Sequence, residues 1–242
     1  MVVIALLMAL LACPAAAYAH EESDTEKPTL TVTGNGQLAL APDTAFVTLG
    51  METAGKSLAE AQKMNHAVMQ KVSERLKELQ IDKERIQTSS FTVSPQYRPP
   101  PKRPADAPPA PPEIIGYMVS NNVTVEVRNL EKVSAVIEES LAAGANHFHG
   151  LHWALRDEQQ AKLGALKQAA AKAREKAAAL SEALKVKLVR LFSATEESRV
   201  VHPMPKVSRS MAYADGGGET PIFSGEIKVE ATVTLVYEIG QE

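Results

Sequence analysis

The chain of 242 residues is 45% apolar, 23% charged and 5% aromatic, and its formal net charge is −3. This composition is typical of a globular protein and excludes wholesale disorder, collagen-like repeats and a multi-span membrane protein. The 26 basic and 29 acidic residues leave no excess of positive charge, which argues against a nucleic-acid partner. Cys13 is the single cysteine, so the rest of the chain has no disulfide, cysteine-based zinc site or thiol nucleophile.

The N-terminus predicts export. Residues 2–11 form an apolar run, too short for a membrane-spanning helix of about 20 residues, and small residues follow up to an A-x-A motif ending at Ala19. We therefore expect residues 1–19 to be a signal peptide and the protein to be periplasmic, although no Lys or Arg precedes the run. Cys13, preceded by Leu-Leu-Ala, gives the alternative of a lipid-anchored N-terminus. No later segment is apolar enough to span a membrane.

Residues 20–29 are polar and acidic, which predicts a flexible lead. Alternating apolar residues then predict a strand over 30–40, in which Gly34-Asn35-Gly36 supplies turn or bulge chemistry. A second strand is expected over 45–51, because its apolar residues fall on one face.

A helix is expected next. Ser57 and Glu60 form a capping box, a pattern typical of a helix start. Apolar residues at 3–4 spacing should line one side of this helix: Leu58, Ala61, Met64, Val68, Val72, Leu76 and Leu79.

The next strand, expected over 86–97, runs into the segment 98–112, in which eight of fifteen residues are proline. Proline cannot donate to a sheet, so this segment is predicted to be a solvated, extended loop, with a polyproline ligand for an aromatic groove as the alternative. Alternation resumes over 116–127. Asn129 can then cap a short helix that ends at Gly144.

A strand through Phe148, Leu151 and Trp153 precedes the strongest helical pattern, over 157–185. Apolar residues in this helix step 3-4-3-4: Leu163, Leu166, Ala170, Ala173, Ala177, Leu180 and Leu184. This seam could contact a helix of another subunit or pack on the chain's own sheet. Strands over 186–197 and 225–239 complete the pattern.

These elements predict an α+β fold. Residues 43–155 have the order β-α-β-β-α-β, the split βαβ arrangement, with an antiparallel sheet and helices on one face. The strand before this unit and the helix-strand-strand unit after it are expected to enlarge the sheet, giving a domain over 30–239 with the proline-rich loop inserted.

Motifs that carry chemistry are missing from the sequence: it contains no GxSxG, HExxH, P-loop or strand-GxGxxG-helix unit. We therefore predict no catalytic residues, no cofactor and no enzyme activity. The exception to consider is the histidine cluster, because His147 and His149 point the same way on a regular strand and two imidazoles can bind copper or zinc.

A third ligand for such a site is not specified by spacing. His66 and His202 are the candidates for it, and His20 would become an N-terminal chelator of copper(II) if cleavage follows Ala19. The alternative is structural: Phe148 and its apolar neighbours are buried, and the histidines occupy the solvated face.

Several stretches together resemble the SIMPL-domain family of exported bacterial proteins, over about 30–239. The matching stretches are Thr31-Val32-Thr33-Gly34-Asn35-Gly36, Pro42-Asp43, Ile86-Gln87-Thr88-Ser89-Ser90-Phe91 with Pro95 and Tyr97, Gly116-Tyr117, Asn121-Asn122-Val123, Val127-Arg128-Asn129-Leu130, Ala143-Gly144-Ala145-Asn146, and Pro221-Ile222 with Gly225-Glu226. The proline-rich insertion and the histidine cluster depart from the family's usual pattern.

The resemblance implies a periplasmic α+β protein that self-assembles and is linked to envelope or oxidative stress, with no catalytic residues to carry over. The leading hypothesis is therefore a non-enzymatic periplasmic interaction protein, a homo-oligomer with an unknown envelope partner. The alternative is a periplasmic copper- or zinc-binding protein that uses His147 and His149.

Overall fold

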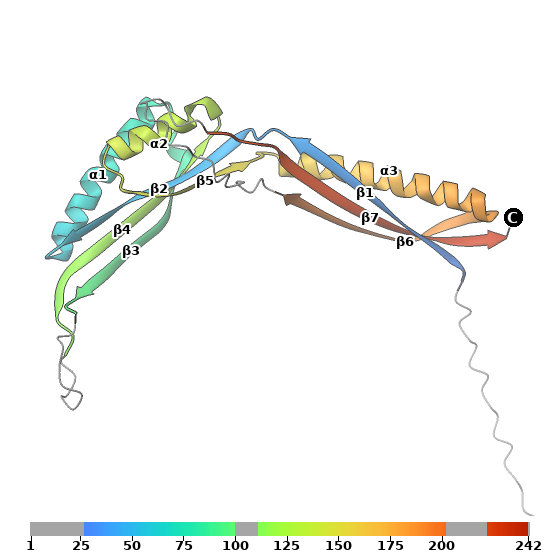
Figure 1. The fold of residues 1–242 in the computed structure, drawn as a ribbon, viewed down its shortest axis with the longest axis horizontal. Helices are drawn as coiled ribbons and strands as arrows, with labels where there is room; N and C mark the ends of the chain where they lie inside the picture. The colour runs from blue at the N-terminus through green and yellow to red at the C-terminus, as the bar shows by residue number, and fades with distance from the viewer. Residues whose placement is uncertain (1–26, 100–110, 202–221, 242) are drawn as a thin grey trace, which may run out of the picture.

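The computed structural model describes residues 27–99, 111–201 and 222–241 as two lobes joined end to end at an angle (Figure 1). The predictions on the signal peptide, Cys13, His20, His202 and most of the proline-rich loop lie outside these residues. The elements are β1 (Thr29–Leu40), β2 (Thr44–Gly55), α1 (Leu58–Glu78), η1 (Lys83–Arg85), β3 (Ile86–Tyr97), β4 (Ile114–Val127), η2 (Leu130–Lys132), α2 (Val133–Ala142), β5 (His147–Ala154), α3 (Glu158–Leu184), β6 (Val186–Val201) and β7 (Ile227–Gln241).

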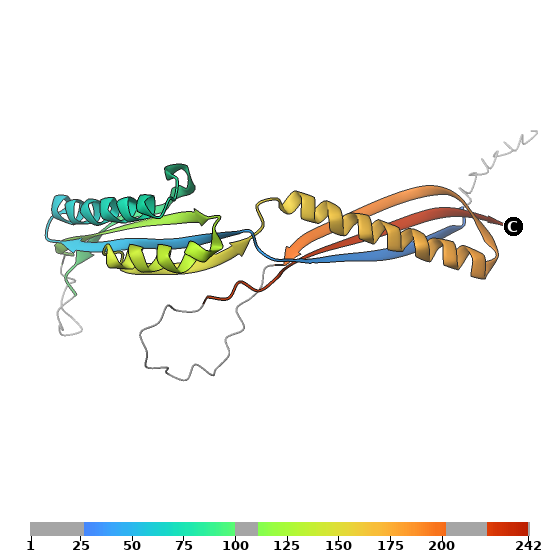
Figure 2. The same ribbon diagram turned by 90° about the horizontal axis from the view of Figure 1, so that it is seen from above.

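The first lobe is a four-stranded antiparallel sheet in the order β3-β4-β2-β5. Its chain order is βαββαβ, so the predicted split βαβ unit is confirmed. Helices α1 and α2 lie side by side over one face of this sheet (Figure 2). The buried face of the sheet carries the alternating residues that the sequence pattern placed there: Ala45, Val47, Leu49, Val123, Val125 and Val127.

Helix α1 begins as predicted and then differs in one position. The Ser57 hydroxyl accepts a hydrogen bond from Glu60 N at 3.2 Å, and the Glu60 carboxylate accepts one from Lys56 N at 3.0 Å. Met64, expected on the buried side, is 40% exposed, whereas Asn65 is 2% exposed. The Asn65 amide donates to the carbonyls of Met51 and Val119, at 2.9 and 3.2 Å, and so links the helix to two strands.

The second lobe corrects the prediction of one enlarged sheet. Strands β1, β7 and β6 form a separate three-stranded antiparallel sheet, in that order, with its own core. Strand β7 is central, and Ile227, Val229, Ala231, Val233 and Leu235 are all buried, as their alternation predicted. Helix α3 covers this sheet (Figure 2).

Gly34 and Gly36 do not form a turn, contrary to the sequence-based prediction. Strand β1 pairs with β7 without a break from Thr29 to Leu40. A Cβ atom on Gly34 would lie 2.1 Å from Ala169 O, and one on Gly36 would lie 2.0 Å from Ala165 O. The glycines are therefore required because the backbone of α3 approaches β1 too closely for any side chain.

The buried face of α3 is formed by alanines at every fourth position: Ala161, Ala165, Ala169, Ala173 and Ala177. Three leucines of the predicted seam, Leu163, Leu180 and Leu184, are 41–57% exposed. Helix α3 thus packs on its own sheet, the second of the two alternatives, and its alanine row follows from the close approach to Gly34 and Gly36.

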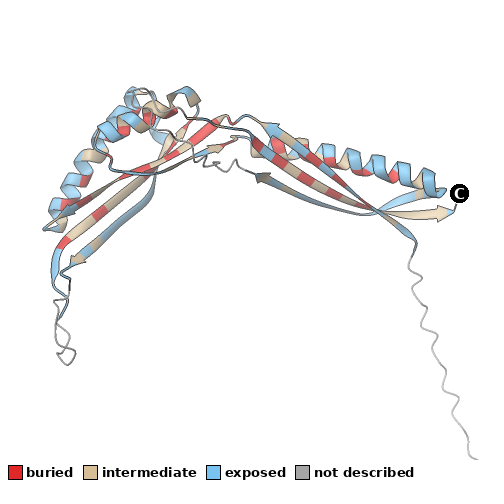
Figure 3. Ribbon diagram, viewed as in Figure 1, coloured by how far each residue is buried: buried red, intermediate tan, exposed pale blue. Residues whose placement is uncertain are grey.

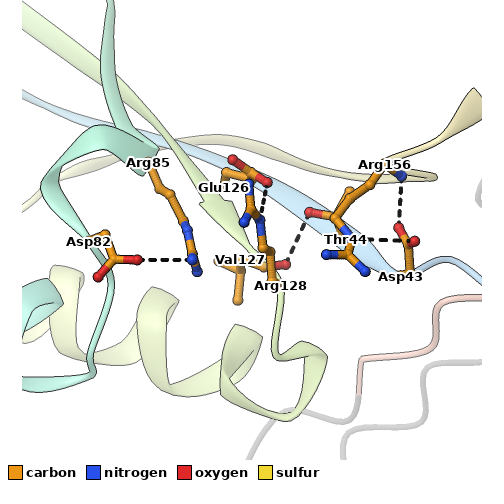
Figure 4. A network of polar contacts seen from close by, with 8 residues as sticks. All are labelled: Asp43, Thr44, Asp82, Arg85, Glu126, Val127, Arg128 and Arg156. Carbon is orange, nitrogen blue, oxygen red and sulfur yellow. Dashed lines mark hydrogen bonds and ion pairs between the residues drawn. The ribbon is translucent and has the colours of Figure 1, made fainter.

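The two lobes meet where β1 continues into β2 and β5 continues into α3. Asp43 accepts a hydrogen bond from Arg156 N at 2.8 Å, and its other oxygen lies 3.4 Å from Arg156 Nε (Figure 4). Asp43 N in turn donates to the carbonyl of Ala154 at 3.2 Å. These contacts tie the two connecting segments together at the junction.

Burial is uneven across the strands (Figure 3). The strands under the helices alternate between buried and partly exposed residues, whereas the edge strands β3 and β6 contain no buried residue. None of the helices in residues 27–99, 111–201 and 222–241 has the length and apolar character needed to cross a membrane.

Candidate functional site

The histidine cluster lies on β5, an edge strand of the four-stranded sheet. Thr48 of β2 pairs with Gly150 and Leu49 pairs with Phe148, so His149 is an extra residue with no partner on β2. Gly150 has φ +142°, a conformation that side chains other than hydrogen rarely allow. The sequence therefore forms a β-bulge at His149, a local irregularity that is common next to functional sites.

The bulge brings two imidazole rings together. The rings of His147 and His149 stack with their centroids 5.7 Å apart and their planes 21° apart. The expectation that these two side chains share one face of the strand is confirmed. The structural alternative holds only in part, because Phe148 is 48% exposed rather than buried.

Asn122 of β4 reaches across β2 to the histidines. Its Oδ1 lies 3.0 Å from His149 Nε2. A Cβ atom on Gly50, the β2 residue between them, would lie 2.0 Å from the same Oδ1, so a glycine is needed at this position. The sequence analysis did not identify Asn122 or Gly50 as site residues. The sequence feature that could have indicated Asn122 is the pair Asn121-Asn122 inside a valine-rich strand, where asparagine is disfavoured.

Glu52 lies on the other side of the pair. Its Oε1 is 3.9 Å from His147 Nε2, within ion-pair range but too far for a hydrogen bond. Two hydrogen bonds with Asn146 hold the Glu52 backbone: Glu52 N donates to Asn146 Oδ1 at 2.8 Å, and Asn146 Nδ2 donates to Glu52 O at 2.9 Å. The cluster thus has a defined frame on the sheet face opposite the helices.

The other predicted ligands are not added to this cluster. His66 lies on α1, which covers the opposite face of the sheet. In the part of the chain that the structure describes, no group of three or more His, Cys, Asp or Glu side chains is placed to hold a metal ion. The predicted site therefore contains two imidazoles and one nearby carboxylate.

Apolar side chains gather elsewhere, on the β3–β4 hairpin. Phe91, Val93, Tyr97, Ile114 and Ile115 are 37–56% exposed. Strand β3 is an edge strand, so its outer backbone groups are not paired in the sheet. Pro95, which lacks an N–H, is compatible with such an edge.

The second lobe has a similar edge in β6. Val189, Leu191 and Phe192 are 49–59% exposed. The register of β6 against β7 shifts at Val189 and again at Phe192. Arg190 places its guanidinium 5.6 Å from the Phe192 ring centroid. Each lobe therefore presents an exposed edge strand with apolar side chains, β3 or β6, opposite its other edge, β5 or β1.

Comparisons with known proteins agree with the resemblance noted from the sequence. The model of the SIMPL family, described as a protein of unknown function (DUF541), matches residues 30–237. Two similar proteins are each named 26 kDa periplasmic immunogenic protein, one from Brucella melitensis biotype 1 and one from Brucella abortus strain S19. Each is 33% identical over 228 residues, which cover 92% of this chain and 90% of the relative.

Proposed function

The chain belongs to the SIMPL family, and on that premise we propose that it is a non-enzymatic periplasmic protein that acts by self-association. The relatives named as periplasmic support the compartment, as does the apolar N-terminal run ending at Ala19. We further propose a role in the response of the cell envelope to oxidative or other stress, through a partner in the envelope.

The observation that carries the self-association is the pair of exposed edge strands, β3 and β6, one in each lobe. Phe91 on β3 is 56% exposed and Phe192 on β6 is 59% exposed. A long edge with apolar side chains is a ready template for pairing with another chain. Because the two edges differ, pairing β3 of one copy with β6 of the next would be a heterologous contact. Such a contact gives a ring where the rotation between copies closes and an open filament where it does not.

The names of the relatives, which describe an immunogenic protein and state no activity, support the non-enzymatic part of the proposal. A stable contact between copies is expected to bury on the order of 1,000 Å² or more. The alanine row of α3 does not provide that contact, since it is already buried against the chain's own sheet.

Light scattering coupled to size-exclusion chromatography tests the proposal on the exported protein. We expect the wild-type protein to be an oligomer and F91K or F192K to reduce its mass without changing its circular dichroism. M64K is the matched control, because Met64 is also exposed, at 40%, but lies on α1 rather than on an edge strand. A wild-type monomer at tens of micromolar, or variants that leave the oligomer intact, would overturn it.

The cellular part of the proposal needs a separate experiment. Deletion of the gene should sensitise cells to oxidants or to envelope-damaging agents, and restoring the wild-type gene should remove that sensitivity. A deletion strain that tolerates these stresses as well as its parent would contradict the stress role and leave the self-association to be judged by its own measurement.

A further inference from the structure

We infer that His147 and His149 form a binding site for a divalent ion of the late first transition row, such as Zn²⁺ or Cu²⁺. The site lies on the face of the four-stranded sheet opposite α1 and α2, and it does not depend on the proposed self-association. Imidazole nitrogens are preferred ligands of these ions, and the two rings are already held side by side, with centroids 5.7 Å apart.

The hydrogen bond to Asn122 determines which nitrogen of His149 can bind. An amide oxygen only accepts, so the 3.0 Å contact between Asn122 Oδ1 and His149 Nε2 requires the proton on Nε2. The lone pair is then on Nδ1, which is available to a metal. A ligating histidine commonly donates its second ring N–H to an oxygen in this way.

Glu52 places a carboxylate charge beside His147, although no hydrogen bond joins the two side chains. Its carboxylate lies 3.9 Å from His147 Nε2, and its backbone is held by two hydrogen bonds to Asn146. A negative charge beside Nε2 favours the proton there and leaves Nδ1 of His147 as the ligand atom. Water supplies the remaining positions around the ion.

The surrounding backbone is shaped for this arrangement. The bulge at His149, with Gly150 at φ +142°, places both rings on one side. Gly50 has no side chain, so Asn122 can cross β2 to reach His149. Three strands therefore contribute to the site: β4 with Asn122, β2 with Gly50 and Glu52, and β5 with the two histidines.

Isothermal titration of the untagged, exported protein with zinc chloride tests this inference, with magnesium chloride as the negative probe because Mg²⁺ prefers oxygen ligands. We expect one Zn²⁺ per chain. H147Q/H149Q should abolish this binding, whereas the control H66Q, on α1 and the other face of the sheet, should retain it. Because the two target side chains are exposed, the double variant should keep the wild-type circular dichroism.

Asn122 gives a second, independent readout. N122A should weaken zinc binding by about 10–100-fold, the usual effect of removing a partner of a ligating histidine, and N122D should restore it by keeping an acceptor oxygen. The inference is overturned if the wild-type protein takes up no zinc at about 100 μM, a concentration that detects even weak sites. It is equally overturned if the folded H147Q/H149Q variant binds zinc as the wild type does.

Discussion

Gly34 of β1 lies directly against Ala173 of α3. A Cβ atom on Gly34 would be 2.9 Å from Ala173 Cβ and 2.5 Å from Ala173 N. The obstacle includes helix backbone, which cannot move aside as a flexible side chain can. This contact explains why a Thr-Gly-Asn-Gly stretch occurs inside a continuous strand.

Replacing Gly34 with alanine is therefore expected to destabilise the three-stranded lobe by about 3 kcal/mol, the upper end of the range for overpacking. Urea unfolding followed by far-ultraviolet circular dichroism measures this effect. G164A is the matched control, since its Cβ would meet only the end of the Leu38 side chain, at 2.7 Å, and alanine favours a helix. Equal stability of G34A and wild type would mean that α3 can lift away from β1 at little cost.

The sequence predicted the element types because their signals are local. The alternation in β2, β4 and β7 and the capping box at Ser57 each depend on neighbouring residues, and the structure confirms them. The division into two sheets could not be predicted in this way. It depends on which edge of which strand is paired, and β1 pairs with β7, about two hundred residues away in sequence.

Other differences arise where a long-range contact overrides a local pattern. The glycines of β1 suggested a turn because glycine is disfavoured in strands. They are needed instead because helix α3, which is distant in sequence, packs directly against β1. Likewise, the 3-4 pattern of α3 predicted a buried seam that included several leucines. The residues that are buried are alanines at every fourth position. Small residues indicate that two backbone segments approach each other closely, but the sequence alone does not identify the second segment.

The candidate site was predicted in part. The spacing of His147 and His149 placed both rings on one face, which the structure confirms. Asn122, Gly50 and Glu52 come from other strands, so no spacing rule could connect them with the histidines. The bulge at His149 was also not predicted, because its conformation depends on the register of β5 against β2.

The buried amide of Asn65 leads to a second prediction. It donates to two strand carbonyls, of Met51 and Val119. N65A should leave both acceptors without this donor and cost about 2–3 kcal/mol. Fluorescence of Trp153, which packs against the core of this lobe, reports the loss. Q62A, an exposed change on the same helix, should be neutral; an equal loss in both variants would contradict the role of Asn65.

The proline-rich loop gives a third prediction. The hairpin is closed before the loop, because Arg98 N donates to Glu113 O at 2.9 Å and the two side chains form an ion pair at 2.8 Å. Replacing residues 100–110 with a short Gly/Ser linker should therefore shift the melting temperature by no more than a few degrees, since the entropic cost of closing a loop changes only slowly with its length. A collapse in soluble yield would show that this segment is needed for folding.

Glu238 gives a pH prediction. Its pKa is held below the ordinary value of 4.5, first by a hydrogen bond from Arg190 and then by one from Lys27. A carboxyl group whose pKa is lowered by folding stabilises the folded protein at pH values above its ordinary pKa. This stabilisation is lost as the pH falls from the ordinary pKa through the lowered pKa of the folded state. The wild-type melting temperature should therefore fall more steeply than that of E238Q between about pH 5 and pH 3. Parallel curves for the two proteins would show that the ion pairs do not affect stability.

The last prediction concerns Ala173 and Ala177. Both are completely buried between α3 and its own sheet, where the helix backbone lies against Gly34. The double variant A173E/A177E would place two carboxylates in an apolar layer with no room for a side chain, and burial of an unpaired charge is far more costly than a lobe of this size can tolerate. We expect loss of the α3 helical signal in circular dichroism.

The matched control is L180E/L184E on the same helix. These leucines are 41% and 57% exposed, so two glutamates there should leave the protein folded. A folded A173E/A177E protein that has merely become smaller would assign the alanine row to a contact between subunits. Unfolding of A173E/A177E together with a folded control would instead establish that the alanines serve the lobe's own core, and that any self-association must use a different surface, such as the edges of β3 and β6.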